Sequence, residues 1–128
     1  MSINYDSAIL VVDDMPTMRR VLAGILKNIG FKKIYEAKDG VDALKILSSD
    51  GDKIELTIVD WNMPKLNGMD LWRKMKTINE YQHIKFIMVS SENERANIMT
   101  ALKEGVTNYI VKPFDPKTIK DRIEKVFG

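Results

Sequence analysis

The chain has 128 residues, of which 45% are hydrophobic and 30% are charged, with a net charge of +2. This length and composition predict one folded domain over residues 1–128, and the balanced charge does not favour a nucleic-acid-binding protein. Because the sequence has no cysteine and one histidine, it excludes disulfides, thiol catalysis, thiolate metal sites and histidine-cluster metal sites. No apolar run approaches the roughly 18 residues of a membrane span, and the first residues lack a signal-peptide pattern, so we expect a cytoplasmic protein.

Apolar residues alternate along the chain between short continuous runs and helical spacing. The runs at 8–12, 56–59 and 86–89 are apolar almost throughout, which is typical of strands covered on both faces. Pro16 and Gly30 mark the two ends of the first helical segment. In chain order, the expected elements are a strand at 8–12, a helix at about 16–29, a strand at 34–37, a helix around 41–47, a strand at 56–59, a helix around 71–78, a strand at 86–89, a helix at about 94–104, a strand at 108–112 and a helix around 119–127.

This alternation of strands and helices predicts an α/β fold. Repeated βαβ units form a parallel sheet with helices on both faces. The three apolar strands belong in the centre of the sheet, and the more polar strands at 34–37 and 108–112 are expected at its edges.

Charged and hydroxyl side chains directly follow three of the five expected strands, and Lys112 ends a fourth. The carboxyl ends of parallel strands meet at one edge of the sheet, which is where such sheets bind ligands. Each residue alone has a structural explanation, because an aspartate or serine can cap a helix or start a turn and a lysine can be solvated. Their coincidence at four strand ends instead favours a site made of Asp13, Asp14, Asp60, Ser90, Ser91 and Lys112.

The carboxylates of this predicted site require a compensating cation. Two carboxylates about 4 Å apart repel by roughly 4 kcal/mol at an effective dielectric constant near 20. Oxygen ligands without histidine or cysteine favour a hard divalent ion, with Mg²⁺ first. A metal ion, the Lys112 ammonium and a hydroxyl around one carboxylate form a cradle for phosphoryl oxygens. We therefore expect Asp60 to act as a nucleophile and to become an aspartyl phosphate.

Four motifs stand in register along the chain: Val-Val-Asp-Asp at 11–14, Asp-Trp-Asn-Met-Pro at 60–64 followed by Gly68, Val-Ser-Ser-Glu at 89–92, and Tyr-Ile-Val-Lys-Pro-Phe at 109–114. Together they resemble the receiver domain of bacterial two-component systems, and within it the chemotaxis receivers of the CheY type. The resemblance covers essentially the whole chain and implies a flavodoxin-like, doubly wound sheet of five parallel strands in the order 2-1-3-4-5, with five helices.

The resemblance also implies a role for each residue of the site. Asp60 corresponds to the phosphoacceptor, and Lys112 would bind a phosphoryl oxygen. Asp14 would ligate Mg²⁺ directly and Asp13 mainly through water, while the backbone carbonyl of Asn62 would complete the protein ligands.

Further positions correspond to the switch of this family. Ser90 stands where a hydroxyl moves to the phosphoryl group, and Tyr109 where an aromatic ring turns inward on activation. Asn62 and Glu92 occupy positions that tune phosphoryl hydrolysis, and they match the rapidly dephosphorylating chemotaxis type.

Two implications concern the last strand and helix. The bond between Lys112 and Pro113 is expected to be cis, as it is in the family. Arg122 and Lys125 align with basic residues of a partner-binding face, but a solvated helix face with favourable charge near its C-terminus explains them equally well.

The resemblance implies a signalling switch rather than an enzyme with an external substrate. A CheA-type histidine kinase would supply the phosphoryl group, and a FliM-type flagellar motor switch protein would receive the signal. A phosphatase is a further candidate partner, and we expect a monomer that binds neither nucleic acid nor membranes. The alternative is another single-domain receiver: a phosphate sink, a phosphorelay intermediate or a receiver from a longer regulator.

Two unrelated functions fit the sequence poorly. A flavodoxin-like cofactor binder needs a Gly/Ser/Thr-rich phosphate loop where this chain has Asp-Asp-Met-Pro at 13–16. A phosphatase of the haloacid dehalogenase type needs a second aspartate where Asn62 stands.

Overall fold

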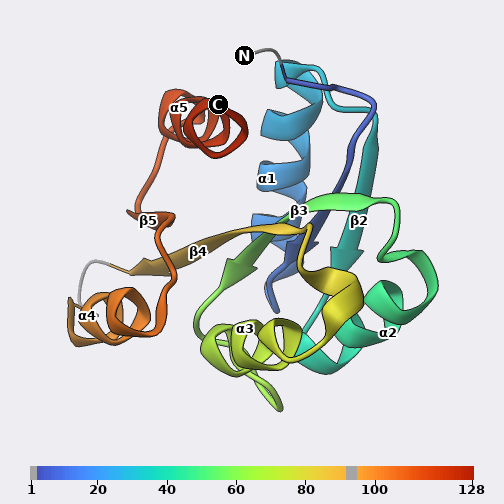
Figure 1. Ribbon diagram of the computed structural model, residues 1–128. Coiled ribbons are helices and arrows are strands. Elements are labelled where there is room, and N and C mark those ends of the chain that lie inside the picture. The colour runs from blue at the N-terminus through green and yellow to red at the C-terminus, as the bar shows by residue number, and fades with distance from the viewer. Residues whose placement is uncertain (1–2, 92–94) are drawn as a thin grey trace.

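The computed structural model describes residues 3–91 and 95–128, which form strands and helices in strict alternation (Figure 1). The elements are β1 (Ala8–Val12), α1 (Pro16–Ile29), β2 (Lys33–Ala37), α2 (Gly40–Asp50), β3 (Ile54–Asp60), α3 (Gly68–Lys76), a 3₁₀ turn (Asn79–Tyr81), β4 (Lys85–Ser91), α4 (Arg95–Glu104), β5 (Tyr109–Lys112) and α5 (Pro116–Phe127).

The five strands form one parallel sheet in the order β2-β1-β3-β4-β5. The predicted flavodoxin-like fold is therefore confirmed, including the central position of the three apolar strands. The register aligns Val12 with Val59, Asp60 with Val89, and Ser91 with Lys112. The carboxyl ends of these strands thus lie side by side at one edge.

Two layers of helices enclose the sheet, with α1 and α5 on one face and α2, α3 and α4 on the other (Figure 1). Because successive strand residues point to opposite faces, neighbouring residues of one strand enter different halves of the core. In β1, Ile9 and Val11 pack with α1 and α5, whereas Leu10 and Val12 pack with α2 and α3. This burial fixes the strand ends that carry the polar residues.

The third helix both begins and ends earlier than predicted, since α3 starts at Gly68 rather than near Leu71. The spacing of apolar residues extended the third helix to Ile78, but α3 ends at Lys76 and Ile78 has an extended backbone. The side-chain amide of Gln82 donates hydrogen bonds to the carbonyls of Met75, Lys76 and Ile78 at 3.0, 3.1 and 2.8 Å. These bonds satisfy carbonyl groups that would otherwise need a further helical turn.

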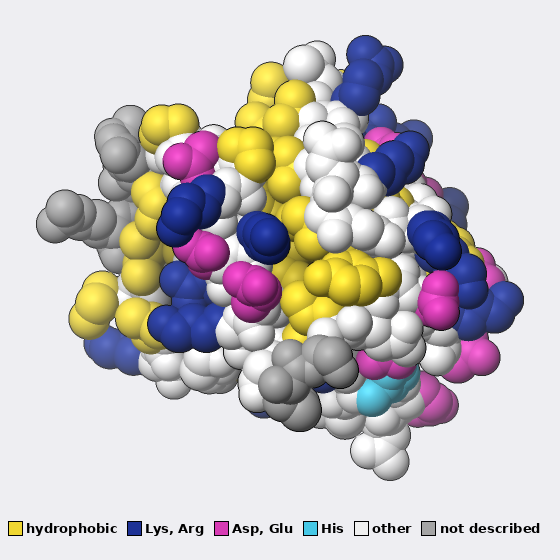
Figure 2. Space-filling view, turned by 90° about the horizontal axis from the view of Figure 1, so that it is seen from above, with side chains coloured by type: hydrophobic (Ala, Val, Ile, Leu, Met, Phe, Trp, Pro, Cys, Tyr) yellow, Lys and Arg dark blue, Asp and Glu magenta, His cyan; other side chains and the backbone are white. Residues whose placement is uncertain are grey.

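Figure 2 views the molecule from above, and hydrophobic side chains form a band on this face between groups of charged side chains. Ile25 and Ile29 of α1 and Pro116 of α5 line a groove between these two helices. None of the described helices combines the length and apolarity that crossing a bilayer requires.

Truncating a side chain on the buried face of α1 should cost far more stability than truncating one on its exposed face. Leu26 is fully buried between α1 and the sheet, so Leu26→Ala is expected to lower the free energy of unfolding by about 2–5 kcal/mol. Val21, on the same helix, is 47% exposed, so Val21→Ala should change stability by roughly 0.5 kcal/mol or less. Urea unfolding of both variants tests this, and equal losses would contradict the assigned packing of α1.

Candidate functional site

Three carboxylates from two strand ends meet at the carboxyl edge of the sheet. Asp13 and Asp14 follow β1 and Asp60 ends β3, and one oxygen of each lies within 4.8 Å of the others. Asp13 is 1% exposed and Asp60 7% exposed, whereas Asp14 is open to solvent. The structure therefore brings together the acidic residues that the sequence predicted to converge.

Lys112, at the end of β5, extends into this cluster. Its ammonium Nζ lies 3.2 Å from Oδ1 of Asp60, to which it donates a hydrogen bond, and 3.8 Å from Oδ2 of Asp13. One positive charge thus faces the two buried carboxylates, as the sequence predicted.

The lysine does not fully compensate for the burial of the acids. Burial raises the pKa of Asp60 from 3.8 to about 6, although the nearby Lys112 ammonium opposes this shift. Burial also raises the pKa of Asp13, against the Met15 backbone N–H and Lys112. Both ionised carboxylates are therefore held at a cost that an additional cation would relieve.

Backbone hydrogen bonds hold Asp13 in place. Its side-chain Oδ1 accepts a bond from the Met15 N–H at 2.9 Å, and its carbonyl accepts one from Nη1 of Arg19 at 2.6 Å. Arg19 also forms an ion pair with Glu36 of β2 at 3.4 Å. Sequence analysis assigned no role to Arg19. Its position one turn into the helix that follows Asp13 and Asp14 could have indicated that it contacts this acidic pair.

The loop after Asp60 passes close to β3 because Gly68 has no side chain. The N–H of Gly68 donates to the carbonyl of Trp61 at 3.0 Å, and a Cβ at position 68 would lie 2.6 Å from the carbonyl oxygen of Asp60. The N–H of Trp61 in turn donates to the carbonyl of Val89 at 2.8 Å. Gly68 therefore allows the close approach that fixes the backbone on both sides of Asp60.

Ser90 lies near the carboxyl end of β4, whereas Tyr109 begins β5, three residues before Lys112. The Ser90 hydroxyl is buried and has no hydrogen-bond partner within residues 3–91 and 95–128. Because β4 pairs with β3, which carries Asp60, this hydroxyl is a hydrogen-bond donor on the neighbouring strand. The Tyr109 hydroxyl is also shielded from solvent. The Tyr109 ring packs against a group of side chains that we name the α3–α4 cluster: Met69, Trp72, Met88, Ala101 and Val106.

Other predicted residues lie in the loop after Asp60 and on α5. Asn62 is exposed in the loop after Asp60, and Arg122 and Lys125 lie on α5, half-buried and exposed respectively. Glu92 lies outside the described residues. The cis bond between Lys112 and Pro113 is confirmed.

The acidic pocket formed by Asp13, Asp14 and Asp60 could bind a metal ion. Its donor set suits such an ion, because the oxygens converge, two of the carboxylates are buried, and burial disfavours their ionised forms in the absence of added positive charge. The exposed Asp14 leaves the pocket accessible from solvent.

Comparisons with known proteins agree with this geometry. A sequence model of the response regulator receiver domain matches residues 9–124. The chain is 44% identical to chemotaxis protein CheY1 of Helicobacter pylori (strain J99) over 94% of this chain and 96% of that protein. It is 39% identical to chemotaxis protein CheY-3 of Vibrio cholerae over 98% and 95% of the two chains. A crystal structure of a response regulator receiver domain protein from Clostridium thermocellum superposes with a TM-score of 0.85 at 29% identity, covering 94% and 93% of the two chains.

The raised pKa of Asp60 predicts a pH-dependent effect of Asp60→Asn on stability. The native carboxyl ionises with a pKa of about 6 when folded and 3.8 when unfolded, so its ionisation destabilises the fold progressively from about pH 4 to pH 6 and fully above. Without divalent cations, Asp60→Asn should therefore match the native chain near pH 4 and exceed its stability above pH 6, by up to about 3 kcal/mol.

Urea unfolding between pH 4 and pH 8 measures this difference. Asp52→Asn, at an exposed aspartate, is the matched control and should leave the pH profile unchanged. A stability difference between native and Asp60→Asn that is constant across this pH range would contradict the assigned cost of burying the Asp60 charge.

Proposed function

Because the chain belongs to the response regulator receiver domain family and is similar to CheY chemotaxis proteins over most of its length, we propose that it is a chemotaxis switch activated by phosphorylation of Asp60. The observation that carries this proposal is the hydrogen bond from Lys112 to Asp60 within a cluster of three carboxylates. A buried carboxylate beside an ammonium and a cation pocket is suited to phosphoryl transfer.

In the proposed reaction, a carboxylate oxygen of Asp60 attacks the phosphorus of a phosphohistidine on a CheA-type kinase. The phosphorus–nitrogen bond breaks, and the histidine leaves with the bonding electrons. Lys112 binds a phosphoryl oxygen and stabilises the negative charge that the transfer brings into the site. The chain thereby catalyses its own phosphorylation and later dephosphorylation, without an external substrate to turn over.

We propose that Mg²⁺ is the ion that occupies the acidic pocket. Asp14 and Asp60 would hold it directly, Asp13 mainly through water, and Asn62 through its backbone carbonyl. When bound, Mg²⁺ supplies positive charge to the phosphoryl oxygens. The raised pKa values of Asp13 and Asp60 support a site that is completed by such a charge.

Phosphorylation would be transmitted through Ser90 and Tyr109. The added phosphoryl oxygens are strong hydrogen-bond acceptors, and the buried hydroxyl of Ser90 is available to donate to them. Movement of Ser90 favours the inward position of Tyr109 and changes the surface formed by α4, β5 and α5. A FliM-type motor switch protein would bind this surface, with Arg122 and Lys125 contributing positive charge.

The phosphoacceptor assignment predicts a metal-dependent adduct. Incubation with acetyl phosphate and Mg²⁺ should add one phosphoryl group, as measured by intact mass, because Asp60 provides a single activated carboxylate. The adduct should disappear in Asp60→Asn and when Mg²⁺ is removed by EDTA. Asp52→Asn is the control that should retain it.

The same adduct also reports on hydrolysis. Asn62 and Glu92 match the rapidly dephosphorylating type, so the adduct should decay within seconds to minutes after acetyl phosphate is removed. An unchanged yield in Asp60→Asn would refute the phosphoacceptor, whereas a lifetime of many hours would count against the chemotaxis assignment alone.

A binding measurement separates chemotaxis from the other single-domain receivers. A peptide from a FliM-type motor protein should bind the phosphorylated chain at least several-fold more tightly than the unphosphorylated chain, as measured by fluorescence anisotropy. Tyr109→Ala should reduce this difference, while Val41→Ala, at an exposed position on α2, should not. Equal and weak binding in both states would favour a phosphate sink, a relay intermediate or a receiver from a longer regulator.

A further inference from the structure

An ion pair that sequence analysis did not identify joins α3 to α4. The Arg73 guanidinium donates from Nε to Oε1 of Glu104 at 2.8 Å and from Nη2 to Oε2 at 2.5 Å. Asp70, one turn earlier on α3, accepts a third bond from Nη1 of Arg73 at 3.0 Å. Two parallel bonds to one carboxylate fix the relative orientation of both groups, which single-contact surface pairs do not.

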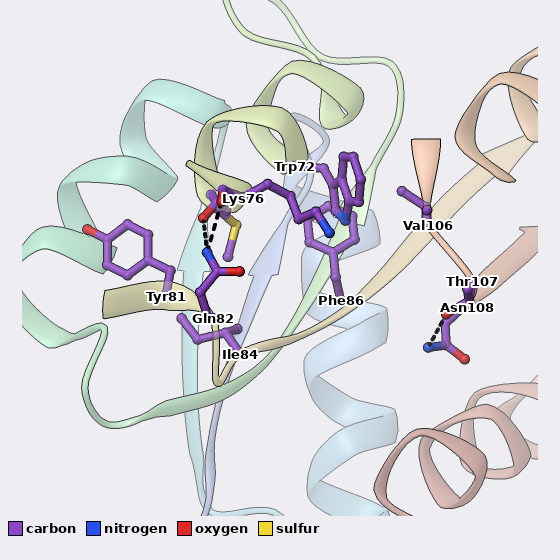
Figure 3. Close-up of a pocket in the computed structure, with 11 residues that line it drawn as sticks. Trp72, Lys76, Tyr81, Gln82, Ile84, Phe86, Val106, Thr107 and Asn108 are labelled. Atoms are coloured by element: carbon purple, nitrogen blue, oxygen red, sulfur yellow. Dashed lines mark hydrogen bonds between the residues drawn. The ribbon is translucent and has the colours of Figure 1, made fainter. Parts of the chain in front are cut away.

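This ion pair spans a region where apolar packing is sparse. Among the described residues of α4, Ala101 is the one buried side chain, whereas α3 buries Met69, Leu71, Trp72 and Met75. A cavity of about 210 Å³ lies between α3 and the segment that follows α4. Figure 3 shows Trp72 and Lys76 on one side of this cavity and Val106, Thr107 and Asn108 on the other. Within the described part of α4, the buried contact with α3 is therefore made by one small side chain, Ala101, beside the ion pair.

The position of Glu104 indicates that the pair matters to α4. Glu104 is the last residue of α4, where the negative end of the helix dipole disfavours a carboxylate. The Arg73 guanidinium reverses this effect, because it brings a positive charge to the same helix end. The pKa of Glu104 is accordingly lowered by its hydrogen bond to Arg73. Loss of Arg73 would remove the ion pair that joins α4 to α3 and would leave the Glu104 carboxylate uncompensated at the C-terminus of α4.

The tethered helix end borders the residues that surround Tyr109. Trp72 directly precedes Arg73, and Ala101 lies one turn before Glu104; both belong to the α3–α4 cluster against which Tyr109 packs. We propose that Arg73 and Glu104 form a latch that holds the C-terminal end of α4 against α3 and thereby favours the inward position of Tyr109. The inference rests on the proposed function only in treating Tyr109 as the switch residue.

The position of Tyr109 can be measured in the unphosphorylated full-length chain by ¹⁹F NMR with 3-fluorotyrosine. The chain has four tyrosines, and Tyr109→Phe identifies the signal. Glu104→Gln and Arg73→Gln should each lower the ratio of inward to outward Tyr109 at least twofold. Because each single variant already removes the same ion pair, the fold-decrease of the ratio in the double variant should be smaller than the product of the two single fold-decreases. Salt at 0.5 M should lower the ratio in the native chain more than in the variants.

A matched control separates the latch from a general loss of surface charge. Asp50→Asn breaks a partly exposed pair with Lys53, at 3.5 Å, that joins no two helices, and it should leave the ratio unchanged. An unchanged ratio in Glu104→Gln, or single effects that multiply fully in the double variant, would overturn the latch. Phosphoryl uptake at Asp60 is measured independently, so failure of the latch and failure of the proposed function give different results.

Discussion

The structure depends on the placement of two carboxylates, Asp13 and Asp60, in a buried pocket with too little positive charge to balance them. Lys112 reaches both, yet the pKa of each acid stays above its ordinary value. Repulsion of a few kcal/mol between such neighbours is a cost that folding must offset. The same imbalance suits the pocket to a cation, which under the proposed function would complete a cradle for phosphoryl oxygens. The burial of Asp13 and Asp60 thus both destabilises the fold and suits the pocket to a cation.

The sheet meets this cost by burying apolar strands on both faces. Within β1 and β3, every residue of 8–12 and 56–59 is buried, so the strand ends cannot move apart without exposing the core. The helices are not anchored equally. α1 and α3 insert several side chains into the core, whereas the described part of α4 inserts Ala101 and is tied to α3 through Arg73 and Glu104. The strands that carry the site are therefore extensively buried, whereas the described part of α4 is held by fewer buried side chains.

Much of this arrangement could be predicted from sequence, because its signals are local. Short apolar runs defined the strands, and the residues that follow them, Asp13, Asp60 and Lys112, converge as parallel topology dictates; the strand order came from family resemblance. The predictions failed where a side chain outside the element, rather than the element's own apolar pattern, decides the outcome. Apolar spacing extended α3 to Ile78, but the Gln82 amide, a few residues farther along the chain, bonds the carbonyls at the end of the helix. The Arg73–Glu104 pair joins residues 31 positions apart and becomes visible only once the helices are placed.

The most direct test of this account is the pKa of Asp60 itself, measured by ¹³C NMR titration of the side-chain carboxyl groups with and without Mg²⁺. Without the metal ion, Asp60 should titrate near pH 6, and Lys112→Met should move the titration higher still. Mg²⁺ should move it several tenths of a unit or more downward. Titration of Asp60 near pH 4 without Mg²⁺, and no response to the ion, would contradict the claim that an unbalanced buried carboxylate underlies the site.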